Sequence, residues 1–178
     1  MKKVALVMAF GLALAAGVGA QAPVDLKVGD TAPAFSLPGT DGKTHTLADY
    51  KGRFVVLAWY PKAFTNGCTA ECKAFTSSGE TIKSFNVAYF MASVDDADTN
   101  KKFAEQEQAN FPMLSDPSKK VADAYGVLTP TPGVGFAKRW TFYIGPDGKI
   151  LYIDKAVNTA TAGADLAARL ESLGARKK

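Results

Sequence analysis

Two cysteines four residues apart, Cys68 and Cys72, have the clearest potential for chemistry in this chain. They end the segment Pro61-Lys-Ala-Phe-Thr65-Asn-Gly-Cys68-Thr-Ala-Glu-Cys72, which directly follows the apolar run 54–60. That run is rich in β-branched and aromatic residues and indicates a buried strand, and the Thr-Asn-Gly sequence marks a turn before a helix. Cys68 is therefore expected in the first helical turn, where free backbone N–H groups and the helix dipole favour the thiolate. Such a thiolate attacks electrophiles or binds soft metals.

Two motifs give the chain a family resemblance. The pattern Pro61-x-x-x-Thr65-x-x-Cys68 resembles the active-site signature of the peroxiredoxins, and Arg139-Trp-Thr-Phe-Tyr-Ile-Gly-Pro-Asp-Gly148 resembles the family's distal Arg-x-Thr-Phe strand and turn. The resemblance extends to residues 32–37, 41–43 and 125–127, and so covers nearly all of the chain after its N-terminal segment. It implies an antioxidant oxidoreductase, a thiol-dependent peroxidase that reduces hydrogen peroxide or organic hydroperoxides through a cysteine sulfenic acid.

The resemblance assigns Cys68 as the redox-active nucleophile, where the alternative is a buried, inert cysteine. It gives the Thr65 hydroxyl a hydrogen bond with the thiolate and the bound peroxide, although Thr65 could also be a turn or capping residue. Pro61 would shield the thiolate from water, a role compatible with ending the strand. Arg139 would stabilise the thiolate and the charge that builds on the peroxide oxygen, where the alternative is a surface charge. Glu71 could close onto the helix N-terminus or orient Arg139.

Cys72 resembles the second cysteine of the bacterioferritin-comigratory (PrxQ) peroxiredoxins, but it lies four positions after Cys68 instead of five. Helix positions i and i+4 share a face with Cβ atoms about 5–6 Å apart. A disulfide needs about 3.5–4.5 Å between those atoms, so the start of the helix would have to unwind. Cys72 is thus a candidate resolving cysteine or a passive core residue. In the second case an external thiol must resolve the sulfenic acid.

The N-terminal segment predicts export. Residues 1–20 begin Met-Lys-Lys, continue as an apolar run and end in Val18-Gly-Ala20, which is typical of a secretory signal peptide. Cleavage is expected after Ala20 or Ala22, since the run is shorter than the ~20 residues that a membrane span needs. The expected location is the periplasm, or outside the cell, with no membrane attachment after cleavage. Residues 23–178 then form one domain, large enough to bury a core without disulfides.

The order of predicted elements indicates an α/β protein with a thioredoxin-like fold: a central mixed sheet flanked by helices, with an N-terminal β-hairpin. Continuous apolar strands alternating with helices indicate a parallel pair buried on both faces. The loop 129–138, rich in Pro and Gly, would deliver Arg139 to the site. The expected strands are 35–37, 44–47, 54–60, 87–94, 140–144 and 149–153, with a short segment at 111–114, and the expected helices are 68–84, 99–108, 117–125 and 160–173.

Composition and motifs limit the partners and the rival functions. The formal net charge of +4 falls by two without Lys2 and Lys3, which gives no electrostatic basis for nucleic-acid binding. The expected partners are a peroxide and a thiol reductant, either a thioredoxin-like protein or a small thiol, and no metal or organic cofactor is implied. The oligomeric state is left open.

Two other functions use the same fold. Sco-like copper proteins use Cys-x-x-x-Cys, which Cys68 and Cys72 match, but they also need a histidine far downstream. The only histidine, His45, precedes both cysteines in a predicted hairpin. A general thiol-disulfide oxidoreductase would use Cys-x-x-Cys, a different spacing.

Overall fold

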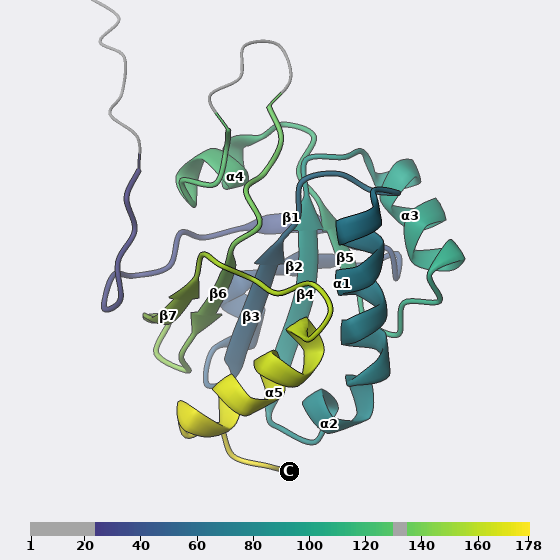
Figure 1. Cartoon of the computed structure of the whole chain (residues 1–178). Helices are drawn as coiled ribbons and strands as arrows, with labels where there is room; N and C mark the ends of the chain where they lie inside the picture. Colours follow the sequence, from purple (N-terminus) through teal and green to yellow (C-terminus); the bar gives the residue numbers. More distant parts are fainter. Residues whose placement is uncertain (1–23, 130–134) are drawn as a thin grey trace, which may run out of the picture.

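A five-stranded mixed sheet forms the centre of the molecule (Figure 1). The computed structural model describes residues 24–129 and 135–178. The strand order is β5 (Met113–Ser115), β4 (Val87–Ser93), β3 (Phe54–Trp59), β6 (Thr141–Ile144) and β7 (Ile150–Asp154). Strands β3, β4 and β5 run parallel, whereas β6 is antiparallel to both β3 and β7. Strands β1 (Ser36–Pro38) and β2 (Thr44–Thr46) form the separate hairpin that the sequence predicts.

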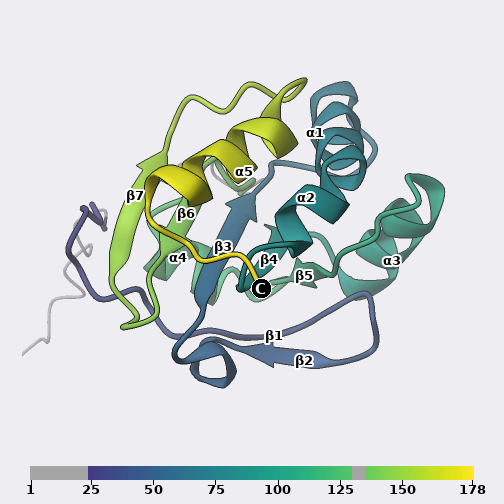
Figure 2. The same ribbon diagram turned by 90° about the horizontal axis from the view of Figure 1, so that it is seen from below.

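Helices cover both faces of this sheet (Figure 2). On one face lie α1 (Asn66–Ser77), α2 (Gly79–Lys83) and α5 (Ala162–Ser172). The β1–β2 hairpin and α4 (Lys120–Ala124) cover the other face, and α3 (Ala97–Gln106) packs beside the edge strand β5. A short 3-10 helix, η1 (Leu47–Tyr50), follows the hairpin. Gly163 lets helices α5 and α1 approach closely, since a Cβ at this position would lie only 2.1 Å from the Ala74 carbonyl oxygen.

The position of β3 between two cores explains why its sequence is almost uniformly apolar. Val55, Leu57 and Trp59 point into one core, while Val56 and Ala58 point into the other. A strand with helices or a hairpin on both faces buries both sets of side chains. The structure therefore confirms the predicted mixed sheet with flanking helices and an N-terminal hairpin.

Most observed boundaries lie within two residues of the predicted ones, but two helices differ more. The predicted helix 68–84 is two helices, because the helical path is interrupted at Ser78. Gly79, the first residue of α2, lies against the Asn110 side chain, where a Cβ would be only 2.5 Å away. The predicted helix 117–125 begins only at Lys120, so Pro117 is not in its first turn. The Asp116 carboxylate accepts hydrogen bonds from two backbone N–H groups of α4, Val121 and Ala122, each at 2.9 Å.

Some predictions fall on residues outside the described ranges. The predicted signal peptide, its cleavage after residue 20 or 22, and the central part of the loop 129–138 are among them. No helix in the ranges 24–129 and 135–178 is long and apolar enough to cross a membrane.

Candidate active site

The turn between β3 and α1 places Cys68 at the start of a helix. The chain leaves β3 at Trp59 and enters α1 at Asn66, with Thr65 in an extended conformation at the N-cap position. Cys68 is the third residue of α1 and is fully buried, with no exposed surface. It lies in the first turn, as predicted, although the helix begins two residues before the predicted start. The positive end of the helix dipole therefore acts on its sulfur.

Strand pairing brings Arg139 to the same place from 71 positions along the chain. Ala58 of β3 is paired with Thr141 of β6, and the Trp59 N–H donates to the Trp140 carbonyl at 2.9 Å. Arg139, just before β6, therefore lies beside the end of β3. Its Nη2 donates to the Cys68 Sγ at 3.3 Å. A guanidinium at this distance places a positive charge and a hydrogen-bond donor beside the sulfur atom.

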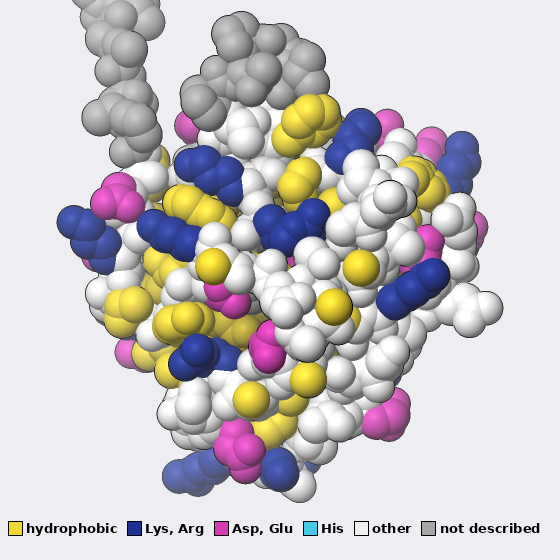
Figure 3. Space-filling view, in the orientation of Figure 1, with side chains coloured by type: hydrophobic (Ala, Val, Ile, Leu, Met, Phe, Trp, Pro, Cys, Tyr) yellow, Lys and Arg dark blue, Asp and Glu magenta, His cyan; other side chains and the backbone are white. Residues whose placement is uncertain are grey.

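Several Lys and Arg side chains are spread over the face of the molecule seen in Figure 3. Lys62 carries a half-exposed ammonium group in the turn before α1, and Lys138 precedes Arg139. The Arg139 side chain itself is 21% exposed, so a small polar molecule can reach it from solvent.

Glu71 holds the other side of the Arg139 guanidinium through a hydrogen-bonded ion pair with Nη1. The Glu71 side chain is fully buried, and its second oxygen, Oε1, has no hydrogen-bond partner in the described part of the chain. Burial raises the pKa of Glu71 to about 7, against the lowering effect of Arg139. Burial also lowers the pKa of Arg139, but Glu71 and Cys68 more than compensate, so the net shift is upward.

Glu71→Gln is expected to change how stability depends on pH. The folded wild type binds more protons than the unfolded chain between pH 4.5, the ordinary pKa of the carboxyl group, and about 7. Its free energy of unfolding should therefore fall as pH rises through this window, and the glutamine variant should lack that dependence. Urea unfolding of both proteins at pH 5 and pH 8 measures the difference. Parallel pH profiles would contradict the burial effect.

Of the two roles considered for Glu71, the structure shows the contact with Arg139. A capping interaction requires the glutamate at the third helical position. Because α1 begins at Asn66, Cys68 occupies that position and Glu71 lies one turn further along. The two residues thus meet the guanidinium from consecutive turns of one helix.

Thr65 and Pro61 belong to the turn that precedes the helix. The Thr65 hydroxyl donates to the Lys62 carbonyl at 3.0 Å and makes no side-chain capping bond to α1. Its lone pairs are left to accept a hydrogen bond from a molecule bound near Cys68. Pro61 is half-buried and comes directly after the end of the sheet pairing. The residue before it, Tyr60, donates its N–H to the Ala92 carbonyl of β4 at 2.9 Å.

Cys72 lies on the same helix as Cys68, and both thiols are free and fully buried. Burial, with a further contribution from Glu107, raises the pKa of the Cys72 thiol to about 12. In this conformation Cys72 is protonated at neutral pH and is a poor nucleophile.

Gly67 contributes to the site in a way that its sequence context does not indicate. A Cβ at this position would lie 3.1 Å from the Arg139 Nη2, so a larger residue would crowd the guanidinium. The only sequence signal is a glycine directly before the candidate nucleophile, which by itself indicates no more than a turn.

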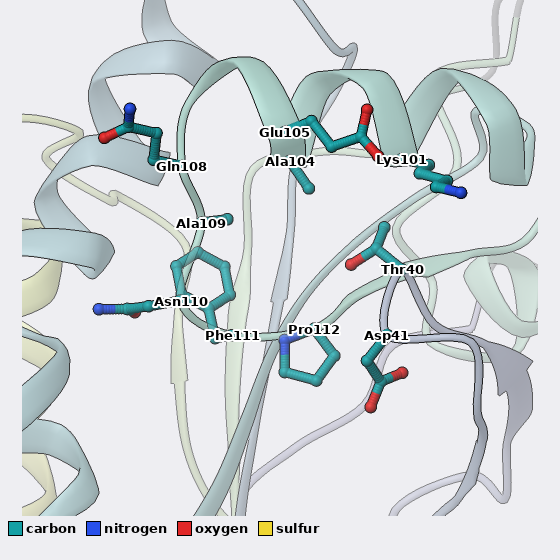
Figure 4. A pocket seen from close by; sticks show the side chains of 10 residues that line it. All are labelled: Thr40, Asp41, Lys101, Ala104, Glu105, Gln108, Ala109, Asn110, Phe111 and Pro112. Carbon is teal, nitrogen blue, oxygen red and sulfur yellow. The ribbon is translucent and has the colours of Figure 1, made fainter.

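The other candidate sites in the described part of the chain lack a comparable cluster of reactive side chains. The cavity in Figure 4, about 450 Å³, lies between α3 and the segment before β5, and none of its lining residues is a candidate site residue. His45 contacts Phe90 in the core on the opposite face of the sheet from Cys68. Among residues 24–129 and 135–178, no group of three or more His, Cys, Asp or Glu could hold a metal ion. This arrangement does not favour a Sco-like copper site.

Comparison with known proteins places the whole site within one family. The model of the AhpC/TSA family matches residues 28–153, which include all six candidate residues. The chain is 36% identical over 132 residues to Peroxiredoxin Bcp of Escherichia coli K12, covering 72% of this chain and 85% of that protein. It is 33% identical over 130 residues to Peroxiredoxin Bcp of Bacillus subtilis, covering 71% and 83%.

Solved structures agree with this assignment. The crystal structure of peroxidoxin BcpB from Mycobacterium tuberculosis superimposes with a TM-score of 0.76 at 30% identity, covering 83% of this chain and 98% of that one. That of a Xylella fastidiosa PrxQ mutant has a TM-score of 0.77 at 24% identity, covering 84% and 98%, and supports the fold. The chain therefore belongs to the AhpC/TSA family and is a peroxiredoxin of the Bcp/PrxQ type, a thiol peroxidase with the thioredoxin-like fold.

Proposed function

We propose that Cys68 reduces hydrogen peroxide or organic hydroperoxides as the peroxidatic thiolate. Its sulfur attacks the terminal peroxide oxygen, the O–O bond breaks, and the leaving alkoxide or hydroxide takes a proton to become alcohol or water. Cys68 is left as a sulfenic acid. The observation that carries this proposal is the 3.3 Å contact between the Arg139 Nη2 and the Cys68 Sγ.

The neighbouring side chains have distinct roles in this step. The guanidinium donates to the thiolate and then to the peroxide oxygen on which negative charge develops. Glu71 fixes the guanidinium from its far side, so that the donor does not have to reorient during the reaction. Thr65 accepts a hydrogen bond from the peroxide, and Pro61 limits access of water to the thiolate.

The second half of the cycle returns the sulfenic acid to the thiol. A thiol attacks the sulfenic sulfur, water leaves, and a disulfide forms. For Cys72 to be that thiol, α1 must unwind at its start, because the i and i+4 Cβ atoms of an intact helix are about 5–6 Å apart and a disulfide needs about 3.5–4.5 Å. Unwinding would also expose Cys72 to water, which removes the cause of its raised pKa. An external reductant, a thioredoxin-like protein or a small thiol, then reduces the disulfide or, if Cys72 does not react, the sulfenic acid itself.

One equivalent of hydrogen peroxide, added without oxygen and followed by intact-mass measurement, tests both halves of the cycle. The wild type is expected to lose two hydrogens and all free thiol, as an internal disulfide forms. Cys72→Ala should stop at a mass gain of one oxygen and should over-oxidise more readily. If both proteins give the same oxidised species, Cys72 is a packing residue and an external thiol resolves Cys68. If neither reacts, the peroxidase mechanism itself is contradicted.

We also propose that the protein acts outside the cytoplasm, because residues 1–20 have the charge, apolar core and small-residue end of a signal peptide. Expression of the full chain in a Gram-negative host should yield periplasmic protein that begins at residue 21 or 23. An intact N-terminus in the cytoplasmic fraction would contradict export.

A further inference from the structure

A buried carboxylate outside the proposed chemistry, Asp95, holds the turn that carries Thr65. Strands β3 and β4 are parallel and adjacent, so their C-terminal ends lie at the same edge of the sheet (Figure 1). Asp95 comes two residues after the end of β4, and its side chain is only 3% exposed. It therefore lies beside the segment that leaves β3.

Each oxygen of this carboxylate accepts a bond from the 61–65 turn. The Asp95 Oδ2 accepts from the Ala63 backbone N–H at 2.9 Å, and Oδ1 accepts from the Lys62 Nζ at 2.9 Å. Beneath it, the Ser93 Oγ lies 3.1 Å from Oδ2. The Lys62 carbonyl in turn accepts from the Thr65 hydroxyl at 3.0 Å. The carboxylate thus anchors the backbone of the turn at Ala63 and the side chain of Lys62, and the Lys62 backbone in turn holds the Thr65 hydroxyl.

The residue between these anchored positions has an unfavourable backbone conformation. Phe64 has φ 64°, in the left-handed region that bulky side chains rarely adopt. The residue is 46% exposed, and its ring meets the Phe103 ring of α3 edge-on, with the centroids 5.2 Å apart. A conformation of this kind persists only where the surrounding structure holds it, and it is concentrated at functional sites. The Phe103 ring restrains the Phe64 side chain, and the bonds of Asp95 to Ala63 and Lys62 restrain the residues directly before it.

We propose that Asp95 is a positioning residue of the peroxidase: it holds the 61–65 turn, with Phe64 in the left-handed region, and so fixes the position of the Thr65 hydroxyl at the start of the helix that carries Cys68. This proposal rests on the proposed function of Cys68. It adds that the hydroxyl is placed by a carboxylate from the neighbouring strand end, in addition to the helix that carries the cysteine. Loss of the carboxylate should let Phe64 relax towards negative φ and rotate Thr65 away from the peroxide.

Asp95→Ala and Asp95→Asn test this with two reagents that react with the same sulfur. Thr65 orients peroxide but is not needed by iodoacetamide, so the two second-order rate constants are compared at matched thiolate fractions. For Asp95→Ala the peroxide rate should fall about 10- to 100-fold, as small displacements at reacting groups do, while the alkylation rate changes less than about threefold. Asp95→Asn keeps an oxygen for the Ala63 N–H but loses the ion pair with Lys62, so a smaller loss of the same kind is expected.

Asp96→Ala is the matched control. Asp96 is adjacent but caps α3, where its side chain accepts from the Thr99 N–H at 2.7 Å. Its loss should lower stability and leave both rate constants unchanged.

A second substitution tests whether Asp95 acts on Thr65 through the backbone conformation of Phe64. Asparagine tolerates the left-handed region far better than phenylalanine. Phe64→Asn should therefore lessen the loss caused by Asp95→Ala, with Phe64→Asn alone as the reference. Equal losses for peroxide and iodoacetamide in Asp95→Ala, or the same fractional loss with and without Phe64→Asn, would overturn the proposal. If the wild type itself shows no peroxide reaction at Cys68, the proposed function fails, a result distinct from either of these.

Discussion

Cys68→Ser is expected to abolish peroxide consumption, so that the purified protein with a thiol reductant removes hydrogen peroxide no faster than the reductant alone. A serine hydroxyl at neutral pH carries no negative charge and cannot form a sulfenic acid. The only other thiol in the chain, Cys72, is buried and has a pKa raised to about 12. No second nucleophile of comparable strength is therefore available at this site.

The Cys68→Ser measurement needs a control for folding and one for the second thiol. Because serine is close to cysteine in size, the variant should unfold at nearly the same urea concentration as the wild type. Cys72→Ala, with an external thiol supplied, should retain the first peroxide reaction. Peroxidase activity in a folded Cys68→Ser protein would show that another residue carries the chemistry.

Arg139→Met should slow the reaction with peroxide by on the order of 100-fold, because a donor aimed at developing charge has an effect of that size. Methionine keeps much of the apolar stem of arginine but removes the bond to the Cys68 Sγ and the ion pair with Glu71. Stopped-flow measurement of peroxide and of iodoacetamide, at matched thiolate fractions, separates two effects of the guanidinium. Stabilisation of the thiolate changes the thiolate fraction and is removed by the matching, whereas stabilisation of the peroxide transition state affects the peroxide rate alone.

A second arginine supplies the matched control for this substitution. Arg169 on α5 lies over the Tyr152 ring, with its guanidinium carbon 3.9 Å from the ring centre, and makes no contact with Cys68. Arg169→Met should leave both rates unchanged. Small, equal losses for peroxide and iodoacetamide in Arg139→Met would place Arg139 outside the reaction.

The fold was largely predictable because its signals are local. The apolar run of β3 and the turn residues between β1 and β2 specify a buried strand and a hairpin without reference to the rest of the chain. The break between α1 and α2 was not predictable in this way, since it depends on the Asn110 side chain, which packs at Gly79 from a distant segment. The late start of α4 has a local cause, since the Asp116 carboxylate accepts from the Val121 and Ala122 N–H groups and Lys119 adopts a left-handed φ of 61° just before the helix.

The site was predictable where spacing or a family motif marked it. The four positions Pro61, Thr65, Cys68 and Cys72 lie within one segment, so their proximity follows from the sequence alone. Arg139 could be associated with Cys68 only by resemblance, because the β3–β6 register that brings them together is a tertiary feature.

Two residues around the site were missed for the same reason. Gly67 leaves room for the guanidinium, and Asp95 anchors the turn before α1. An acidic residue just after a parallel strand, at the edge where strand ends converge, is the signal that could have identified Asp95.

The most direct test of the account follows the first sulfur to react. Reduced protein is mixed with substoichiometric hydrogen peroxide, quenched at intervals with an alkylating agent, and digested so that Cys68 and Cys72 are mapped by mass spectrometry. A sulfenic acid on Cys68 is expected as the first product, formed much faster than on free cysteine at the same pH, with Cys72 changed only afterwards. Oxidation of Cys72 first, or a Cys68 rate equal to that of free cysteine, would contradict this expectation.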